Sequence, residues 1–208
     1  MSGRGAPTAR RNRAVESFKN AADCIGTLEK SAGLFAVTRG QFSMIDAILA
    51  CLDQTGPAKI SLWTWTIAEY EIECVNRLRD DGRITGGLLV IDHGALQKNR
   101  PVLEEWQRVN GPESVRYVVN HAKIATIENV GWRLLLRGSM NLNFNPRFEQ
   151  FDITEGGEDF ELIRKVESEL PLLSNHPTGK DVYAASRVSE AFEKDKMAAF
   201  EKCKVWKK

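Results

Sequence analysis

The sequence predicts an α/β fold, in which a mixed β-sheet is flanked by helices on both faces. From residue 58 onward, short runs rich in β-branched and aromatic residues alternate with segments whose apolar residues recur at helical spacing. The 208 residues are 42% hydrophobic and 27% charged, which is typical of one globular domain with a substantial core. Together these observations predict the element order β-α-β-α-β-β-β-α.

Each predicted element rests on its own pattern, and two of them have a clear start or end. The helix over residues 68–82 ends at Gly82, and the helix over residues 95–111 starts afresh at Pro101, because proline is tolerated only in the first turn. The expected elements are, in order, helix 41–53, strand 58–67, helix 68–82, strand 84–92, helix 95–111, a strand in which 114–120 leads into 121–128, strands 132–141 and 150–154, helix 158–173, and helix 186–208.

The chain divides into three expected regions. Residues 1–40 form a basic segment that we expect to be flexible, either a solvated tail or an arm that contacts nucleic acid. Residues 41–175 carry the alternating elements and the expected site. Residues 176–208 hold a loop and an amphipathic helix, which packs on the body or on a partner subunit and ends in a lysine-rich stretch.

Polar residues of two neighbouring strands meet if these strands form a hairpin. Turn residues separate strand 121–128 from strand 132–141, and a turn centred on Val130 places residues whose numbers add up to 260 opposite one another. Since side chains alternate along a strand, one face of this hairpin then presents four polar side chains at one end: His121, Lys123, Ser139 and Asn141.

This set of side chains is suited to a phosphate group. A neutral imidazole serves as nucleophile or proton carrier, and an ammonium two residues away holds the charge of a phosphate oxygen. A hydroxyl and an amide add hydrogen bonds to the same oxygens. No carboxylate cluster suggests a metal, and the cysteines lack zinc-ligand spacing, so we expect neither metal nor cofactor. The cysteines are Cys24, Cys51, Cys74 and Cys203.

The pair H121-A-K123 and G138-S139-M140-N141 resembles the phospholipase D superfamily, whose pattern is H-x-K-x-x-x-x-D followed by G-S-x-N. The resemblance spans residues 58 to 170 and is nearest to small nucleases with one such motif per chain. It implies a phospholipase D-like catalytic domain and a homodimer in which two copies of His121 share one site. One histidine attacks phosphorus and the other protonates the leaving oxygen.

The resemblance also implies roles for the other residues, and the chain departs from the family pattern in places. Lys123 holds the phosphate charge, Ser139 and Asn141 bind its oxygens, and Glu149 is the expected carboxylate that orients the histidine. Glu128 occupies the position of the family aspartate, and we expect it to be structural because it faces away from His121. The hairpin between Lys123 and Gly138 is a few residues longer than in the family pattern, and the stretch from Asn141 to Glu149 is somewhat shorter.

Other polar and aromatic residues have two interpretations each. Asp92 and His93 end a strand, where they form a solvated turn or contribute to a site. Trp63 and Trp65 are two residues apart on one strand and so point to the same face, where they pack in the core or stack on bases. Thr64 and Thr66 are candidates to line the cleft, and His176 lies in a loop.

The predicted function is a metal-independent phosphodiesterase, most readily a nuclease, with DNA favoured over RNA as partner. The alternatives are a catalytically silent nucleic-acid-binding protein, a phosphodiesterase acting on phospholipid, and a structural protein that assembles through its last helix. The net charge of +1 places nucleic-acid contacts in local patches. Without an apolar run or an apolar leader, we expect a cytoplasmic protein with no membrane contact.

Overall fold

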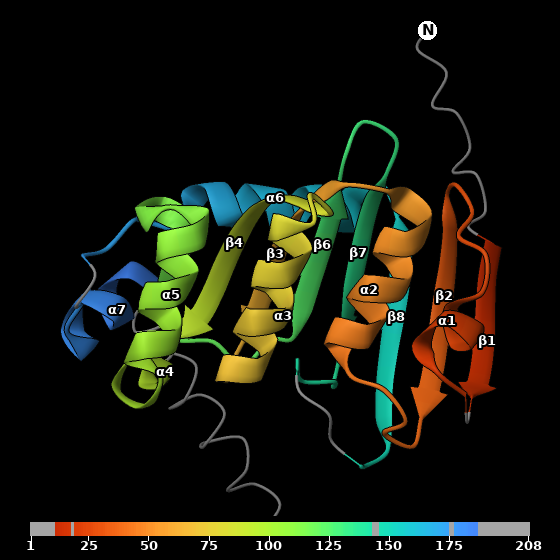
Figure 1. The fold of residues 1–208 in the computed structure, drawn as a ribbon, viewed down its shortest axis with the longest axis horizontal. Coiled ribbons are helices and arrows are strands. Elements are labelled where there is room, and N and C mark those ends of the chain that lie inside the picture. The colour runs from red at the N-terminus through yellow and green to blue at the C-terminus, as the bar shows by residue number, and fades with distance from the viewer. Residues whose placement is uncertain (1–10, 18, 143–145, 175–176, 187–208) are drawn as a thin grey trace, which may run out of the picture.

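The computed structural model describes residues 11–17, 19–142, 146–174 and 177–186, and its centre is an eight-stranded mixed sheet (Figure 1). The strands are β1 (Arg11–Ser17), β2 (Ala32–Thr38), β3 (Ala58–Thr64), β4 (Ile84–Asp92), β5 (Val115–Val118), β6 (Ile124–Glu128), β7 (Arg133–Gly138) and β8 (Glu149–Glu155). The helices are α1 (Ala21–Ile25), α2 (Met44–Thr55), α3 (Glu69–Asp80), α4 (Gly94–Lys98), α5 (Arg100–Asn110), α6 (Glu158–Glu169) and α7 (Gly179–Ser186), with a 3₁₀ turn at Pro112–Ser114.

The strand order is β1-β2-β8-β7-β6-β3-β4-β5. The strands β3, β4 and β5 run parallel to one another, as do β1 and β2. All other neighbouring pairs are antiparallel: β2 with β8, β8 with β7, β7 with β6, and β6 with β3. The predicted mixed α/β sheet is therefore confirmed. The restart of a helix near Pro101 is also confirmed, since this proline lies in the first turn of α5.

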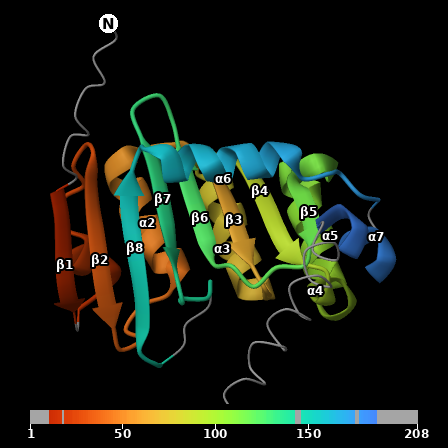
Figure 2. The same ribbon diagram turned by 180° about the vertical axis from the view of Figure 1, so that it is seen from behind.

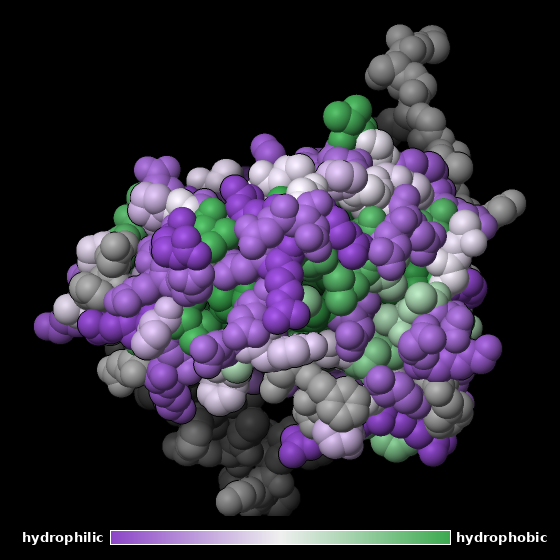
Figure 3. All heavy atoms as spheres, in the orientation of Figure 1, coloured by the Kyte–Doolittle hydropathy of each residue, from purple (hydrophilic) through white to green (hydrophobic). Residues whose placement is uncertain are grey.

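The main core lies between the sheet and the helices that cover the face seen in Figure 1. Helix α2 begins at a capping box, in which Ser43 and Asp46 satisfy each other's backbone N–H groups, and it turns its apolar stripe to the sheet. The outer surfaces of these helices are largely polar, with apolar side chains visible between them (Figure 3). The largest fully buried side chains of this core include Trp106, Phe151, Ile48, Leu62, Leu89 and Ile91.

The other face of the sheet is crossed by α6 (Figure 2). Phe160 is buried here, and Glu167, which is 5% exposed, accepts hydrogen bonds from Ser61 Oγ and from Trp63 Nε1 at 2.9 Å. Arg164 also pairs with Glu167, so this buried carboxylate has the partners that burial of a charge requires. Trp63 is thus a half-buried hydrogen-bonding residue under α6.

The structure differs from the expected flexible segment over residues 1–40. Residues 11–17 and 19–38 contain β1, α1 and β2, and β2 joins the sheet by pairing with β8. The signal in β2 is an inward alternation of Leu34, Ala36 and Thr38, which the apolar neighbours Phe35 and Val37 make inconspicuous. Residues 1–10 and the predicted helix beyond residue 186 lie outside the described residues. Within those described, no helix is long and apolar enough to cross a membrane.

The hairpin between β6 and β7 has a register one residue away from the predicted one. Ile124 pairs with Arg137 and Glu128 with Arg133, so paired residue numbers add up to 261 instead of 260. The reason is the turn: Asn129 Oδ1 accepts hydrogen bonds from the backbone N–H groups of Gly131 at 2.9 Å and Trp132 at 2.8 Å. This Asx turn is centred between Val130 and Gly131. The predicted pairing of His121 with Ser139 and of Lys123 with Arg137 is therefore wrong.

Candidate active site

The motif residues gather at one edge of the sheet although the predicted register fails. The antiparallel order of β6, β7 and β8 brings together the start of β6, the end of β7 and the start of β8. At this edge, the N–H of Gly138 donates to the carbonyl of Lys123 at 3.2 Å, which carries the pairing one residue past the strand. The carboxyl ends of β3, β4 and β5 reach the same edge.

His121 and Lys123 form the first pair of the candidate site. Lys123 Nζ lies 3.5 Å from His121 Nδ1 and 3.4 Å from Nε2, and it donates to the His121 carbonyl at 3.0 Å. His121 is exposed and Lys123 is partly exposed, so both are open to a ligand. An ammonium has only donors, so it can hold phosphate oxygens next to the imidazole.

Ser139 and Glu149 form the second pair. Ser139 Oγ donates to Glu149 Oε2, and it also accepts from the N–H of Gln150 at 3.0 Å. The Ser139 N–H donates to the Gln150 carbonyl at 2.9 Å. Glu149 is 9% exposed and Ser139 is exposed, so the hydroxyl lies at the surface with a buried carboxylate behind it. Two contacts with the start of β8 thus hold the hydroxyl, and a backbone hydrogen bond holds the residue that carries it.

Gly138 allows this second pair to form. A Cβ built on this glycine would lie 2.2 Å from the carbonyl oxygen of Gln150 and 2.7 Å from Phe151 Cα. The glycine of the G-S-x-N stretch is therefore needed because the backbone of β8 approaches β7 closely at this point. Asn141, two residues beyond Ser139, is partly buried, and its carbonyl accepts from the N–H of Met44 at 3.1 Å, which joins the motif to the first turn of α2.

A hydrogen-bonded support holds the loop that carries His121. Asn120 is 7% exposed, and its side-chain amide donates to the carbonyl of Thr64 at 2.9 Å. Asp92 accepts from the N–H of Asn120 and from the N–H of Gly94, both at 2.9 Å. The ends of β3 and β4 therefore fix the approach to His121. Asn120 was missed in the sequence because no motif marks it, and Asp92 was considered only as the end of a strand, without its bond to Asn120.

The other polar candidates from the sequence are His93, Thr64 and His176. The Nδ1 of His93 is buried without a hydrogen-bond partner in the described part of the chain, and its ring lies edge-on to Tyr183, with centroids 5.6 Å apart. Thr64 is buried and donates to the Thr66 carbonyl at 2.7 Å, so its hydroxyl is engaged in the turn after β3. His176 lies outside the described residues.

Glu128 lies at the opposite end of β6 from the motif. It pairs across the sheet with Lys59 and Arg133, and its carboxylate lies 3.4 Å from Arg164 Nε on α6. Its separation from His121 is seven residues, and an extended chain covers about 3.3 Å per residue. The position agrees with a structural role for this residue.

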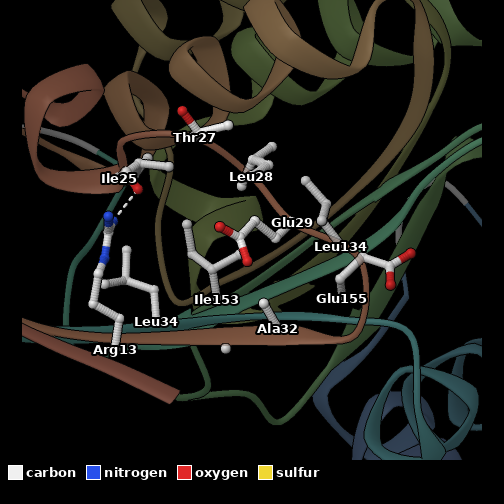
Figure 4. A pocket seen from close by; sticks show the side chains of 11 residues that line it. Arg13, Ile25, Thr27, Leu28, Glu29, Ala32, Leu34, Leu134, Ile153 and Glu155 are labelled. Carbon is white, nitrogen blue, oxygen red and sulfur yellow. Dashed lines mark hydrogen bonds between the residues drawn. The ribbon is translucent and has the colours of Figure 1, made fainter. Parts of the chain in front are cut away.

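The cavity drawn in Figure 4 also lies away from the motif, near the far ends of β7 and β8. Its volume is 240 Å³, and Ile25, Leu34 and Leu134 contribute to an apolar lining, with Glu29 and Glu155 among its polar side chains. Arg13 lines it as well and donates to carbonyls at the end of α1. Elsewhere, no group of three His, Cys, Asp or Glu side chains that could hold a metal ion occurs in the described ranges.

No protein-family model matches the chain, and no curated protein matches it. Solved structures that resemble it include a polyphosphate kinase from Porphyromonas gingivalis, with 14% identity and a TM-score of 0.47 over 65% of this chain and 25% of the kinase. Another is TrmBL2, an archaeal chromatin protein with a novel mode of DNA binding, with 10% identity and a TM-score of 0.43 over 71% of this chain and 55% of that protein. The chain thus spans a quarter and about half of their lengths, and at such low similarity neither structure assigns a family or a function to it.

Proposed function

We propose that the protein is a metal-independent phosphodiesterase, a nuclease that cleaves DNA or RNA through a phosphohistidine at a site shared between two copies of the chain. One observation carries this proposal: the exposed His121–Lys123 pair and the Ser139–Glu149 pair lie at the same edge of the sheet. A nucleophile, a fixed cation and a fixed hydroxyl are what attack on a phosphodiester requires.

In the proposed reaction, an unprotonated ring nitrogen of His121 attacks phosphorus and forms a P–N bond. The P–O bond to the leaving nucleoside breaks, and the partner subunit's His121 protonates the leaving oxygen. That same imidazole then takes a proton from water, which attacks phosphorus, breaks the P–N bond and releases the phosphate. Lys123 offsets the charge that develops on the equatorial oxygens, and Asn141 donates a hydrogen bond to them. The Ser139 hydroxyl, which donates to Glu149 in the free protein, turns its proton to a phosphate oxygen when the substrate binds.

The nuclease activity is tested with labelled single- and double-stranded DNA and RNA in EDTA. Wild type and His121→Ala are compared with Glu128→Gln, whose altered carboxylate lies at the far end of β6. Cleavage by wild type and Glu128→Gln, with none by His121→Ala, is the expected pattern. Binding of nucleic acid without cleavage by wild type supports a silent nucleic-acid-binding protein. Phospholipid vesicles are assayed in parallel, and cleavage confined to them supports a lipid phosphodiesterase. Either outcome rejects the nuclease.

The shared site is tested by subunit mixing. Wild type and His121→Ala are unfolded together and refolded in varied ratios, so that mixed dimers form. If both histidines of a pair are needed, activity falls as the square of the wild-type fraction, whereas independent sites give a linear fall. A monomer by light scattering at assay concentration contradicts the shared site without affecting the role of His121 as nucleophile.

A further inference from the structure

Trp65 is an exposed aromatic residue beside the proposed nucleophile. It follows the last residue of β3, and 49% of its surface is exposed, in contrast to the hydrogen-bonded Trp63 two residues earlier. Its ring centroid lies 6.1 Å from that of His121, and the two rings are inclined by 51°. A single exposed apolar side chain is ordinary on a protein surface, so the position of Trp65 is what matters.

A second aromatic residue lies at the same edge on the other side of the motif. Phe148 precedes β8, is 69% exposed, and has the guanidinium carbon of Arg39 5.1 Å from its ring centroid. Neighbouring strands are about 4.8 Å apart, so β8 is about 10 Å from β6 across β7. Along this edge the order is Arg39 with Phe148, then Ser139 with Glu149, then Lys123 with His121, and finally Trp65.

This order of cations and exposed rings is suited to an unpaired nucleic-acid strand. Positive side chains hold successive phosphates, while exposed rings accept the faces of bases without regard to sequence. Successive nucleotides are separated by about 3.4 Å along a stacked strand. The ring centroids of His121 and Trp65 are 6.1 Å apart, which is within reach of one nucleotide. A phosphate at His121 can therefore have the base of an adjoining nucleotide resting on the Trp65 indole.

We infer that Trp65 is a base-stacking residue and that the substrate of this edge is single-stranded nucleic acid, with a base next to the attacked phosphate resting on the indole. Bases in a duplex are stacked on their neighbours, so their faces reach an aromatic side chain only after the duplex is opened. The same site therefore binds a duplex less tightly than a single strand. The inference rests on the proposed function, since the attacked phosphate is taken to lie at His121.

The test measures binding separately from cleavage. Variants are made in a His121→Ala background, and fluorescence anisotropy in EDTA follows a labelled single-stranded DNA, the matching duplex, and a strand of equal charge with abasic sugars. Trp65→Ala removes the ring and Trp65→Phe keeps a smaller one. Phe35→Ala is the matched control, because Phe35 is similarly exposed, at 46%, in the middle of β2.

Trp65→Ala is expected to weaken binding of the single strand about 5- to 150-fold, the range for loss of one stacked base. Trp65→Phe retains most of the affinity, Phe35→Ala retains all of it, and none of the three changes binding of the abasic strand. An unchanged affinity of Trp65→Ala for the single strand overturns the inference, as does an equal loss on the abasic strand. If wild type cuts no substrate and yet the stacking pattern appears, the nuclease proposal fails and the stacking role stands.

Discussion

Replacement of Gly138 by alanine tests whether the G-S-x-N stretch is held by the close approach of β7 and β8. The new Cβ would lie 2.2 Å from the Gln150 carbonyl oxygen, where real Cβ atoms keep at least 3.0 Å. The two strands must then separate by about 0.8 Å, and overpacking of this kind costs about 1–3 kcal/mol. The two hydrogen bonds between Ser139 and Gln150 weaken as well, at about 1 kcal/mol each.

The lower chain entropy of the unfolded alanine variant offsets about 0.5–1 kcal/mol, so Gly138→Ala is expected to lose about 2–4 kcal/mol of unfolding free energy. Gly86→Ala in β4 is the control, because its Cβ would meet Lys59 Cγ at an ordinary 3.6 Å. Equilibrium urea unfolding of both variants measures the difference. A Gly138→Ala variant as stable as Gly86→Ala would refute the packing argument. Activity below that expected from the folded fraction is also predicted, since Ser139 shifts away from Glu149.

Three further predictions address the support of the site and the interior. Asp92→Ala leaves the N–H groups of Asn120 and Gly94 without their acceptor, and we expect kcat to fall by up to about 100-fold with little change in secondary structure by circular dichroism; full activity contradicts the support. Glu167→Ala leaves the Trp63 indole N–H and the Ser61 hydroxyl without this acceptor, while Arg164 stays partly exposed, and is expected to cost about 1–3 kcal/mol in urea unfolding; an unchanged unfolding free energy contradicts this. Burial raises the pKa of the Cys51 thiol to about 12, so the thiol stays protonated near neutral pH and iodoacetamide should modify it only after unfolding; mass spectrometry of the native protein checks this.

The alternation of elements was predictable because periodicity reports which side of an element is buried. The strands β3, β4, β6, β7 and β8 and the helices α2, α3, α5 and α6 all overlap the predicted ranges. The strands β1 and β2 were not predictable in the same way. The strand β2 is placed by its pairing with β8, which lies more than a hundred residues further along the chain, and β1 is placed by its pairing with β2.

The candidate site was predictable as a set of residues but not as a geometry. The motif spacing marked His121, Lys123, Ser139 and Asn141 as candidates, and Glu149 was expected from the family resemblance. The register depended on whether Asn129 forms an Asx turn. The turn type shifts the hairpin by one residue, which sequence patterns resolve poorly. The pairing of Ser139 with Glu149 needs the bend after β7 and the close approach of β8, and both arise only from tertiary packing.

The most direct test of the account is the initial rate of phosphodiester cleavage in EDTA by wild type and by His121→Ala, each shown to be folded by its urea unfolding curve. The proposed function predicts EDTA-resistant cleavage by wild type and a loss of at least about 10⁴-fold in the variant, because removal of a nucleophile eliminates the covalent path. Cleavage by His121→Ala at a rate near that of wild type, or loss of wild-type cleavage in EDTA, would contradict it.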